Sequence, residues 1–290
     1  MKQIILILAA SFLLFSCNSN QTPKGSSDKK AITVSIVPQK TFVEKIAGND
    51  FEINVLIPPG VTPEAGNLLP SQLKLIANSV LWFRIGYIGF EYSWKDKIEQ
   101  ANRKMKVVDL SEGMDLIAET EGHGDHVHES GIDPHIWMSP RLVKKMAARI
   151  LEEVIALNPE KEAEYKENYL KFAEEADQLD AEIRNLLKDS EGKMFITFHP
   201  SLSYYARDYG LEQLTLESGG KEPTPQHMAG VIRISKAENI DVIYIQSEFD
   251  REHARVFAEE INGKVIQISP LAPNWAENLL EMTRTFAENF

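Results

Sequence analysis

Hydrophobic and polar positions alternate along the first third of the chain in a regular way. Short apolar runs are separated by stretches with helical spacing of their apolar residues. The apolar runs are AITVSIVP from residue 31, FEINVLIPP from 51, VLWFRIG from 80 and KVVDL from 106, and the helical stretches cover 41–47, 70–79 and 94–101. Strands that alternate with helices of this length are typical of βαβ units in a parallel sheet. The pattern predicts an α/β lobe over residues 31–157.

From Pro140 to Asp189 the pattern changes to almost unbroken helix, interrupted at Asn158-Pro159. About 30 residues of continuous helix would extend about 45 Å, longer than one α/β layer needs. In this part apolar side chains recur mostly every three or four residues, at Tyr165, Tyr169, Phe172, Ala176, Leu179, Ile183 and Leu186. Apolar runs then resume in KMFITFHP, EQLTLES, DVIYIQ and KVIQIS. We predict a rigid linking helix over 158–190 and a second α/β lobe over 191–290; a surface helix or a coiled-coil arm is the alternative for the helix.

The N-terminus predicts export from the cytoplasm. Lys2 precedes an apolar run from Ile4 to Phe15, too short to span a bilayer but suited to a signal-peptide core. Cys17, the single cysteine of the chain, follows this run as in a bacterial lipoprotein box, and one cysteine excludes an intramolecular disulfide. We therefore expect residues 1–16 to be a removed signal peptide, Cys17 to carry lipid, and 17–30 to form a flexible tether. A plain secretory peptide with an incidental cysteine is the alternative.

The net charge of −12 narrows the choice of partners. It argues against nucleic acid or an anionic membrane surface, and it favours a cationic or neutral solute. About 260 residues follow the tether, enough for one large domain or two medium ones with their own cores.

Four of the seven histidines fall within thirteen residues, from His123 to His135. Three of them, His123, His126 and His128, belong to the acidic, glycine-containing loop 121–129. Such a loop could hold a metal ion loosely and pass it to a tighter site. An insertion that is merely acidic and solvated is the alternative.

The two remaining candidates for metal binding stand at the ends of regular elements. His135, in DPHIWMSP, lies just before a helix start at Ser139-Pro140, and His199 follows the strand MFITF. Ligands of open α/β sheets bind outside such strand ends, and neutral imidazole suits zinc and neighbouring transition metals. An ion between the two histidines would bridge both lobes. A hydrogen-bonded core histidine is the alternative for each.

A series of segments resembles, in order, the landmarks of the zinc/manganese ABC-transporter substrate-binding lipoproteins. The segments are PPGVTP with PSQ, GYIGFE, VVDLSEGMDLI, DPHIWMSP, TFHPSLSYYARDYGL, KEPTPQHM and ISPL. DPHIWMSP after a histidine-rich loop, and FHP followed by YYARDYGL, are the most specific of them. The resemblance covers nearly the whole mature chain. It implies two α/β lobes joined by a long backbone helix, with a transition metal in the cleft between the lobes.

The same resemblance suggests a ligand set, with two departures. Glu64 stands where the family has a histidine, and a carboxylate can replace it as a zinc or manganese ligand; a solvated loop acid is the alternative. Ser269 stands where an acid often completes the site, and it is a poor ligand. Glu248 could supply that carboxylate, but we expect Glu248 and Asp250 to be first-turn and N-cap acids of the following helix. The predicted ligands are Glu64, His135 and His199.

These observations predict a lipid-anchored, monomeric, non-enzymatic receptor that binds Zn²⁺, or alternatively Mn²⁺, and delivers it to an ABC permease. Two other classes remain open. One is a surface lipoprotein or adhesin with a degenerate metal site. The other is a secreted metallohydrolase with two histidines, one carboxylate and a bound water, although the sequence has no HExxH helix and no evident general base.

Overall fold

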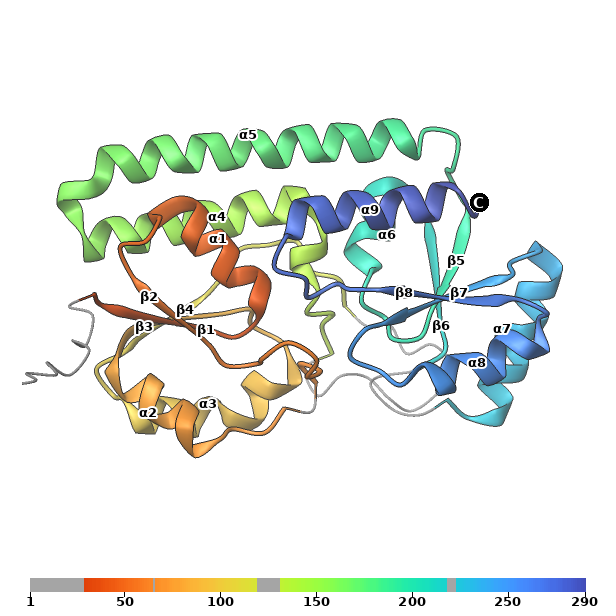
Figure 1. Cartoon of the computed structure of the whole chain (residues 1–290), viewed down its shortest axis with the longest axis horizontal. Coiled ribbons are helices and arrows are strands. Elements are labelled where there is room, and N and C mark those ends of the chain that lie inside the picture. The colour runs from red at the N-terminus through yellow and green to blue at the C-terminus, as the bar shows by residue number, and fades with distance from the viewer. Residues whose placement is uncertain (1–28, 65, 119–130, 218–222) are drawn as a thin grey trace, which may run out of the picture.

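The computed structural model describes residues 29–64, 66–118, 131–217 and 223–290. They form two four-stranded parallel sheets with strand orders β2-β1-β3-β4 and β6-β5-β7-β8. Figure 1 shows the two sheets side by side, with the long helix α5 running above both. The predicted class of two α/β lobes with parallel sheets is confirmed.

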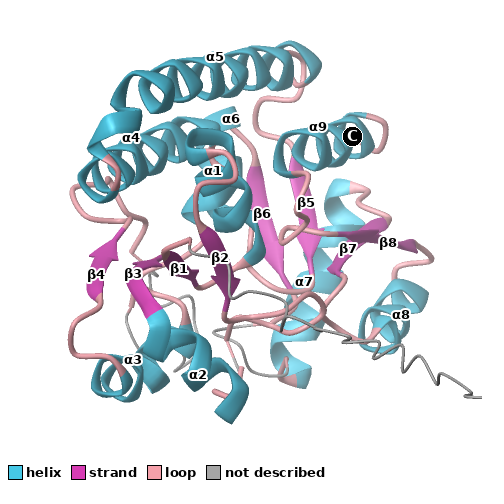
Figure 2. Ribbon diagram, turned by 60° about the vertical axis from the view of Figure 1, so that its left-hand side comes forward, coloured by secondary structure: helices cyan, strands magenta, loops and turns pink. Residues whose placement is uncertain are grey.

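The first sheet and three of its covering helices come from residues 31–109, and a fourth helix, α4, follows at residues 140–157. The central strands β1 and β3 are mostly apolar and mostly buried, because helices cover the sheet on both faces, α1 and α4 on one and α2 and α3 on the other (Figure 2). The elements are β1 (Ala31–Val34), α1 (Val37–Ala47), β2 (Glu52–Val55), α2 (Pro70–Asn78), β3 (Ser79–Arg84), α3 (Gly89–Ala101) and β4 (Lys106–Asp109).

Helix α1 begins four residues earlier than the expected stretch 41–47. Pro38 fits the first helical turn, where its missing N–H is not needed. The side chain of Gln39 accepts hydrogen bonds from the backbone N–H groups of Ser35 (2.9 Å) and Ile36 (3.0 Å). Because these interactions satisfy the helix start, the helix extends to the end of β1.

Two long helices follow and reverse the chain direction. They are α4 (Pro140–Leu157), preceded by the 3₁₀ turn η1 (Ile136–Met138), and α5 (Glu162–Leu186), preceded by the 3₁₀ turn η2 (Pro159–Lys161). The 25 residues of α5 extend about 38 Å. The buried side chains of α5 repeat every three to seven residues, at Tyr165, Phe172, Ala176, Leu179 and Ile183. This stripe is the apolar face that the sequence predicts.

The second sheet occupies the last third of the chain, and the final helix returns to the first lobe. Trp275, the first residue of this helix, packs edge-on against Phe42 of α1 (5.4 Å) and Phe172 of α5 (6.1 Å). One hydrophobic core therefore includes residues of both lobes. The elements are β5 (Met194–Thr197), α6 (Ser203–Tyr209), β6 (Glu212–Thr215), α7 (Pro225–Glu238), β7 (Val242–Gln246), α8 (Arg251–Glu260), β8 (Lys264–Ile268) and α9 (Trp275–Ala287).

Several predicted features fall outside the described residues. These are the signal peptide 1–16, Cys17, the tether up to residue 28, and His123, His126 and His128 of the loop 121–129. In the described ranges, no helix is both long enough and apolar enough to cross a membrane.

Candidate metal site

The three predicted ligands come together between the lobes. Glu64, His135 and His199 each offer a ligand atom, and these atoms all lie within 4.8 Å of one another. The two imidazole rings lie 5.3 Å apart at 71°, both are buried, and Glu64 is half-buried. Residues far apart in the sequence therefore form one group with the donor set of a zinc site.

An acid two residues away fixes the His135 ring. Oδ1 of Asp133 lies 2.9 Å from Nδ1 of His135 and accepts a hydrogen bond from the backbone N–H of His135 at 2.8 Å. Burial by itself would raise the pKa of the Asp133 carboxyl. The charge and hydrogen bonds of His135 lower this pKa by a larger amount, so the net shift is downward. In a neutral His135, Nδ1–H donates to this carboxylate, which leaves the lone pair of Nε2 for a metal.

His199 has an equivalent partner from the next strand of its sheet. Its Nδ1 lies 2.7 Å from Oε2 of Glu217, at the exit of β6. The side chain of Gln246 accepts from the backbone N–H of His199 (3.3 Å) and donates to its carbonyl (2.7 Å). Phe249 stacks on the ring at 5.4 Å. The ring and the backbone of His199 are thus both held in place.

Asp133 and Glu217 orient the two histidines, and neither acid is among the residues predicted from the sequence. A signal for Asp133 was present, since an acid two residues before a candidate ligand can reach its ring. The signal for Glu217 was weaker, because only sheet topology places the exit of β6 beside the exit of β5. Such carboxylates fix the tautomer and orientation of metal-binding histidines.

Glu64 is held by the N-terminus of α3. The backbone N–H of Gly89 donates to Oε2 of Glu64 at 3.3 Å, and that of Phe90 donates to the carbonyl of Pro63 at 2.9 Å. A helix N-terminus stabilises a negative charge through its exposed N–H groups. Glu64 is therefore not the freely solvated loop acid of the alternative interpretation.

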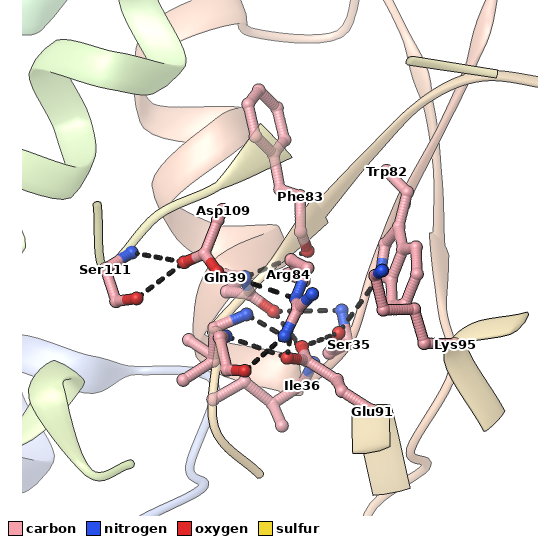
Figure 3. Close-up of polar contacts among 12 residues, drawn as sticks. Ser35, Ile36, Gln39, Trp82, Phe83, Arg84, Glu91, Lys95, Asp109 and Ser111 are labelled. Atoms are coloured by element: carbon pink, nitrogen blue, oxygen red, sulfur yellow. Dashed lines mark hydrogen bonds and ion pairs between the residues drawn. The ribbon is translucent and has the colours of Figure 1, made fainter. Parts of the chain in front are cut away.

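A buried polar network in turn fixes the start of α3 (Figure 3). Glu91, in the first turn, accepts hydrogen bonds from the backbone of Ile85 and Gly86 (both 2.7 Å) and from the hydroxyl of Ser35. It also forms an ion pair with Arg84 at 3.4 Å. Burial raises the pKa of the Glu91 carboxyl despite these interactions. The network ties the helix start to the ends of β1 and β3, and so positions the N–H group that binds the loop acid.

The segment that carries His135 is bonded to the second half of the chain. The contacts involve the backbone carbonyl of Asp133, Trp137 and the helix-capping Ser139. Their partners lie in or near α6, β8 or α9. The bonds are Tyr204 Oη to Asp133 O (2.7 Å), Trp137 Nε1 to Pro270 O (3.0 Å), Trp275 Nε1 to Trp137 O (2.7 Å) and Ser139 Oγ to Asp208 Oδ2 (2.5 Å). These bonds fix the segment of His135 relative to the lobe that carries His199.

A small cavity of about 20 Å³ lies beside the histidines, with room for about one water molecule or ion. It lies where the carboxyl ends of strands from both sheets meet. Its walls are Thr62 and Pro63 from the first lobe, the histidines with Trp137 and Ser201, and Gln246, Glu248, Phe249, Pro270 and Leu271 from the second lobe. Ser269 is not among the residues that line this cavity.

The position of Glu248 differs from the expectation. Helix α8 begins at Arg251, and Asp250 is its N-cap, since its side chain accepts from the backbone N–H of Glu252 at 3.0 Å. The N-cap expectation for Asp250 is confirmed. The first-turn expectation for Glu248 is wrong, because the turn after β7 places it outside the helix and in the cavity wall.

A larger open depression of about 850 Å³ lies over α4, α5 and α6, away from the histidines. Its walls include the ion pairs Lys144–Asp177 (2.6 Å) and Arg184–Asp180 (2.9 Å). These cations neutralise the neighbouring acids, and none of the described residues that line the depression is a histidine. We therefore place the candidate site at the smaller cavity.

Comparisons with known proteins show the family to which the chain belongs. Residues 32–290 match the family model described as ZnuA, zinc-uptake complex component A periplasmic. The chain is 28% identical over 283 residues to the high-affinity zinc uptake system protein ZnuA of Bacillus subtilis, covering 92% of this chain and 88% of that protein. A crystal structure of ZnuA is similar with a TM-score of 0.83 and 34% identity, covering 90% of this chain and 99% of that one. A ZnuA deletion mutant with zinc bound has the same TM-score and identity, covering 90% of this chain and 98% of that one. The chain therefore belongs to the ZnuA family of periplasmic zinc-uptake components.

Proposed function

We propose that this protein is an extracytoplasmic receptor that binds Zn²⁺ in the cleft between its lobes and delivers it to an ABC permease. The convergence of ligand atoms from Glu64, His135 and His199 is the observation that carries the proposal. Family membership and the zinc-uptake name of the Bacillus subtilis relative support it.

The donor set favours zinc over manganese. Two imidazoles and one carboxylate suit a four-coordinate Zn²⁺, whereas Mn²⁺ prefers a shell rich in oxygen ligands. The general order of divalent affinities also places zinc above manganese. Each imidazole is oriented in advance by a carboxylate, so little order has to be created when the ion binds.

Competition titration against a chromophoric chelator tests the proposal. We expect Glu64→Ala to weaken zinc binding by about one to three orders of magnitude, at about 1.4 kcal/mol per tenfold. We expect His135→Ala and His199→Ala to weaken it at least as much, and Glu64→His to retain or tighten it. His227→Ala is the matched control, because His227 lies on α7 and bonds the carbonyl of Thr215. Unchanged zinc affinity in both His135→Ala and His199→Ala would refute the cleft site.

The proposed activity is binding and delivery, without turnover. The zinc-loaded protein is then expected to leave peptide, ester and phosphate substrates intact. Hydrolysis of any of them that disappears in His135→Ala would favour the metallohydrolase class instead. Failure of the protein to bind zinc or manganese in equilibrium dialysis would favour an adhesin with a degenerate site.

The proposal includes a lipid anchor on Cys17 and a monomeric receptor body. The Cys17→Ser variant is expected in the soluble fraction of cells, with unchanged zinc affinity of the purified protein. Membrane retention of that variant would exclude lipid on Cys17 as the anchor. Sedimentation of the purified body gives its oligomeric state, for which we expect a monomer.

The histidine-rich loop 121–129 is proposed to collect ions for the cleft. Deletion of Gly122 to Glu129 is expected to slow zinc uptake when the metal is scarce and to leave the equilibrium affinity unchanged. Stopped-flow loading and competition titration measure these two quantities separately. A collapse of affinity would place the primary site in the loop.

A further inference from the structure

Glu248 occupies the turn between β7 and α8 and not the first turn of α8, where we expected it. Among the described residues that line the small cavity, it is the one carboxylate. Its side chain is half-buried, and Oε1 accepts a hydrogen bond from the hydroxyl of the exposed Ser247 at 2.8 Å. The acid therefore faces the same cavity as His135 and His199.

The turn that carries Glu248 is attached to His199 from both sides. Gln246, two residues before it, bonds the backbone N–H and carbonyl of His199, and Phe249, one residue after it, stacks on the imidazole. The backbone of Ser247 donates to Ile268 of β8 at 3.0 Å. The main chain at Glu248 is thus fixed relative to one metal ligand.

We infer that Glu248 is the fourth ligand of the bound metal, an inference that rests on the proposed function. Glu64, His135 and His199 supply three ligands, and a four-coordinate zinc ion needs one more. Glu248 lies outside that close group, so its side chain rotates toward the ion and exchanges the Ser247 hydroxyl for the metal. A carboxylate oxygen binds zinc at about 2.0–2.2 Å.

This assignment explains why the chain tolerates serine at position 269. The carboxylate that completes the shell comes from the turn after β7 instead of the exit of β8, and both segments line the same cavity. The same assignment also favours metal binding over a hydrolytic function. A zinc ion with four protein ligands has no open position for an activated water, which is the arrangement of a closed site.

Zinc affinity of Glu248→Gln, compared with the wild type, is the first test. Glutamine keeps the size and the hydrogen bond to Ser247 but is a poor zinc ligand, so we expect a loss of about 10- to 100-fold. Glu238→Gln, an exposed acid at the end of α7, removes the same charge away from the cavity and is expected to leave affinity unchanged. Equal affinities of the two variants would overturn the inference.

A zinc-loaded crystal structure of the full receptor body is the second test. We expect an oxygen of Glu248 at ligand distance from the ion. A water in the fourth position, even with reduced affinity of Glu248→Gln, would overturn direct ligation and leave only an effect of charge. Wild-type affinity in His135→Ala and His199→Ala would instead refute the proposed site itself, so the two failures are distinguishable.

Discussion

The backbone N–H of Gly89 lies 3.3 Å from Oε2 of Glu64 and donates a hydrogen bond to it. The contact is close because residue 89 has no side chain. A Cβ at this position would lie 2.7 Å from the carbonyl oxygen of Glu64 and 3.1 Å from Oε2. The absence of one methyl group therefore allows the loop acid to lie on the N-terminus of α3.

Gly89→Ala is expected to displace Glu64 and to weaken zinc binding by about tenfold or more. The clash involves backbone, which cannot move aside as the end of a side chain can. Gly230→Ala is the control, because a Cβ at this helical position meets nothing within 4 Å. Competition titration gives the affinities and denaturant unfolding gives the stabilities. Equal zinc affinity of the two variants would show that the loop adapts to the added methyl group.

Removal of the carboxylate behind His199 is expected to weaken zinc binding without removing a ligand. Glu217→Ala leaves Nδ1 of His199 without its acceptor, and loss of such a partner typically reduces metal affinity by about 10- to 100-fold. Glu217→Gln keeps an acceptor oxygen and should lose less. Glu212→Gln, on the exposed start of β6, controls for charge. Identical calorimetric titrations for Glu217→Ala and the wild type would exclude this role.

Glu91 is expected to make stability depend on pH. Burial raises the pKa of Glu91 in the folded protein above 4.5, so the folded state binds a proton more tightly than the unfolded state. The stabilisation of the folded protein by this proton is complete below the unfolded pKa and is lost as pH rises through the folded pKa. The unfolding free energy of the wild type should therefore fall relative to that of Glu91→Gln as pH increases above about 4.5, and then level off. Denaturant titrations of the metal-free protein between about pH 4 and pH 8 measure this difference. Asp96→Asn, exposed on the same helix, is the control for the loss of one carboxylate.

Ser139 caps α4 and also binds Asp208 of the second lobe. Ser139→Ala should therefore destabilise the protein by about 1 to 3 kcal/mol, more than loss of a cap alone. Thr224→Ala is the control, since Thr224 caps α7 through a 3.2 Å bond from the backbone N–H of His227. A double-mutant cycle with Asp208→Asn isolates the contact between lobes. A coupling energy near zero would mean that Ser139 acts only as a cap.

Local sequence pattern was sufficient for the elements and the fold class. Apolar runs separated by amphipathic helices predict parallel sheets, because burial on both faces requires continuous apolar strands. The spacing of Tyr165, Phe172, Ala176, Leu179 and Ile183 predicts the buried face of α5. Ser139 and Asp250 cap the helices that the sequence assigned to them, because capping involves only residues two or three positions apart. Such features depend on interactions within one turn or one element.

The tertiary structure decided the contacts that surround the candidate ligands. Glu217 reaches His199 because β6 lies next to β5, and Glu248 faces the cavity because the turn after β7 is bonded to the same histidine. The return of α9 to the first lobe, through Trp275, likewise depends on packing between distant segments. No periodicity records these relations, since each joins residues separated by many positions and each arises only when sheets and helices assemble. The sequence by itself thus determined which residues could bind a metal, and the assembled fold brought these residues together and placed Glu217 beside His199.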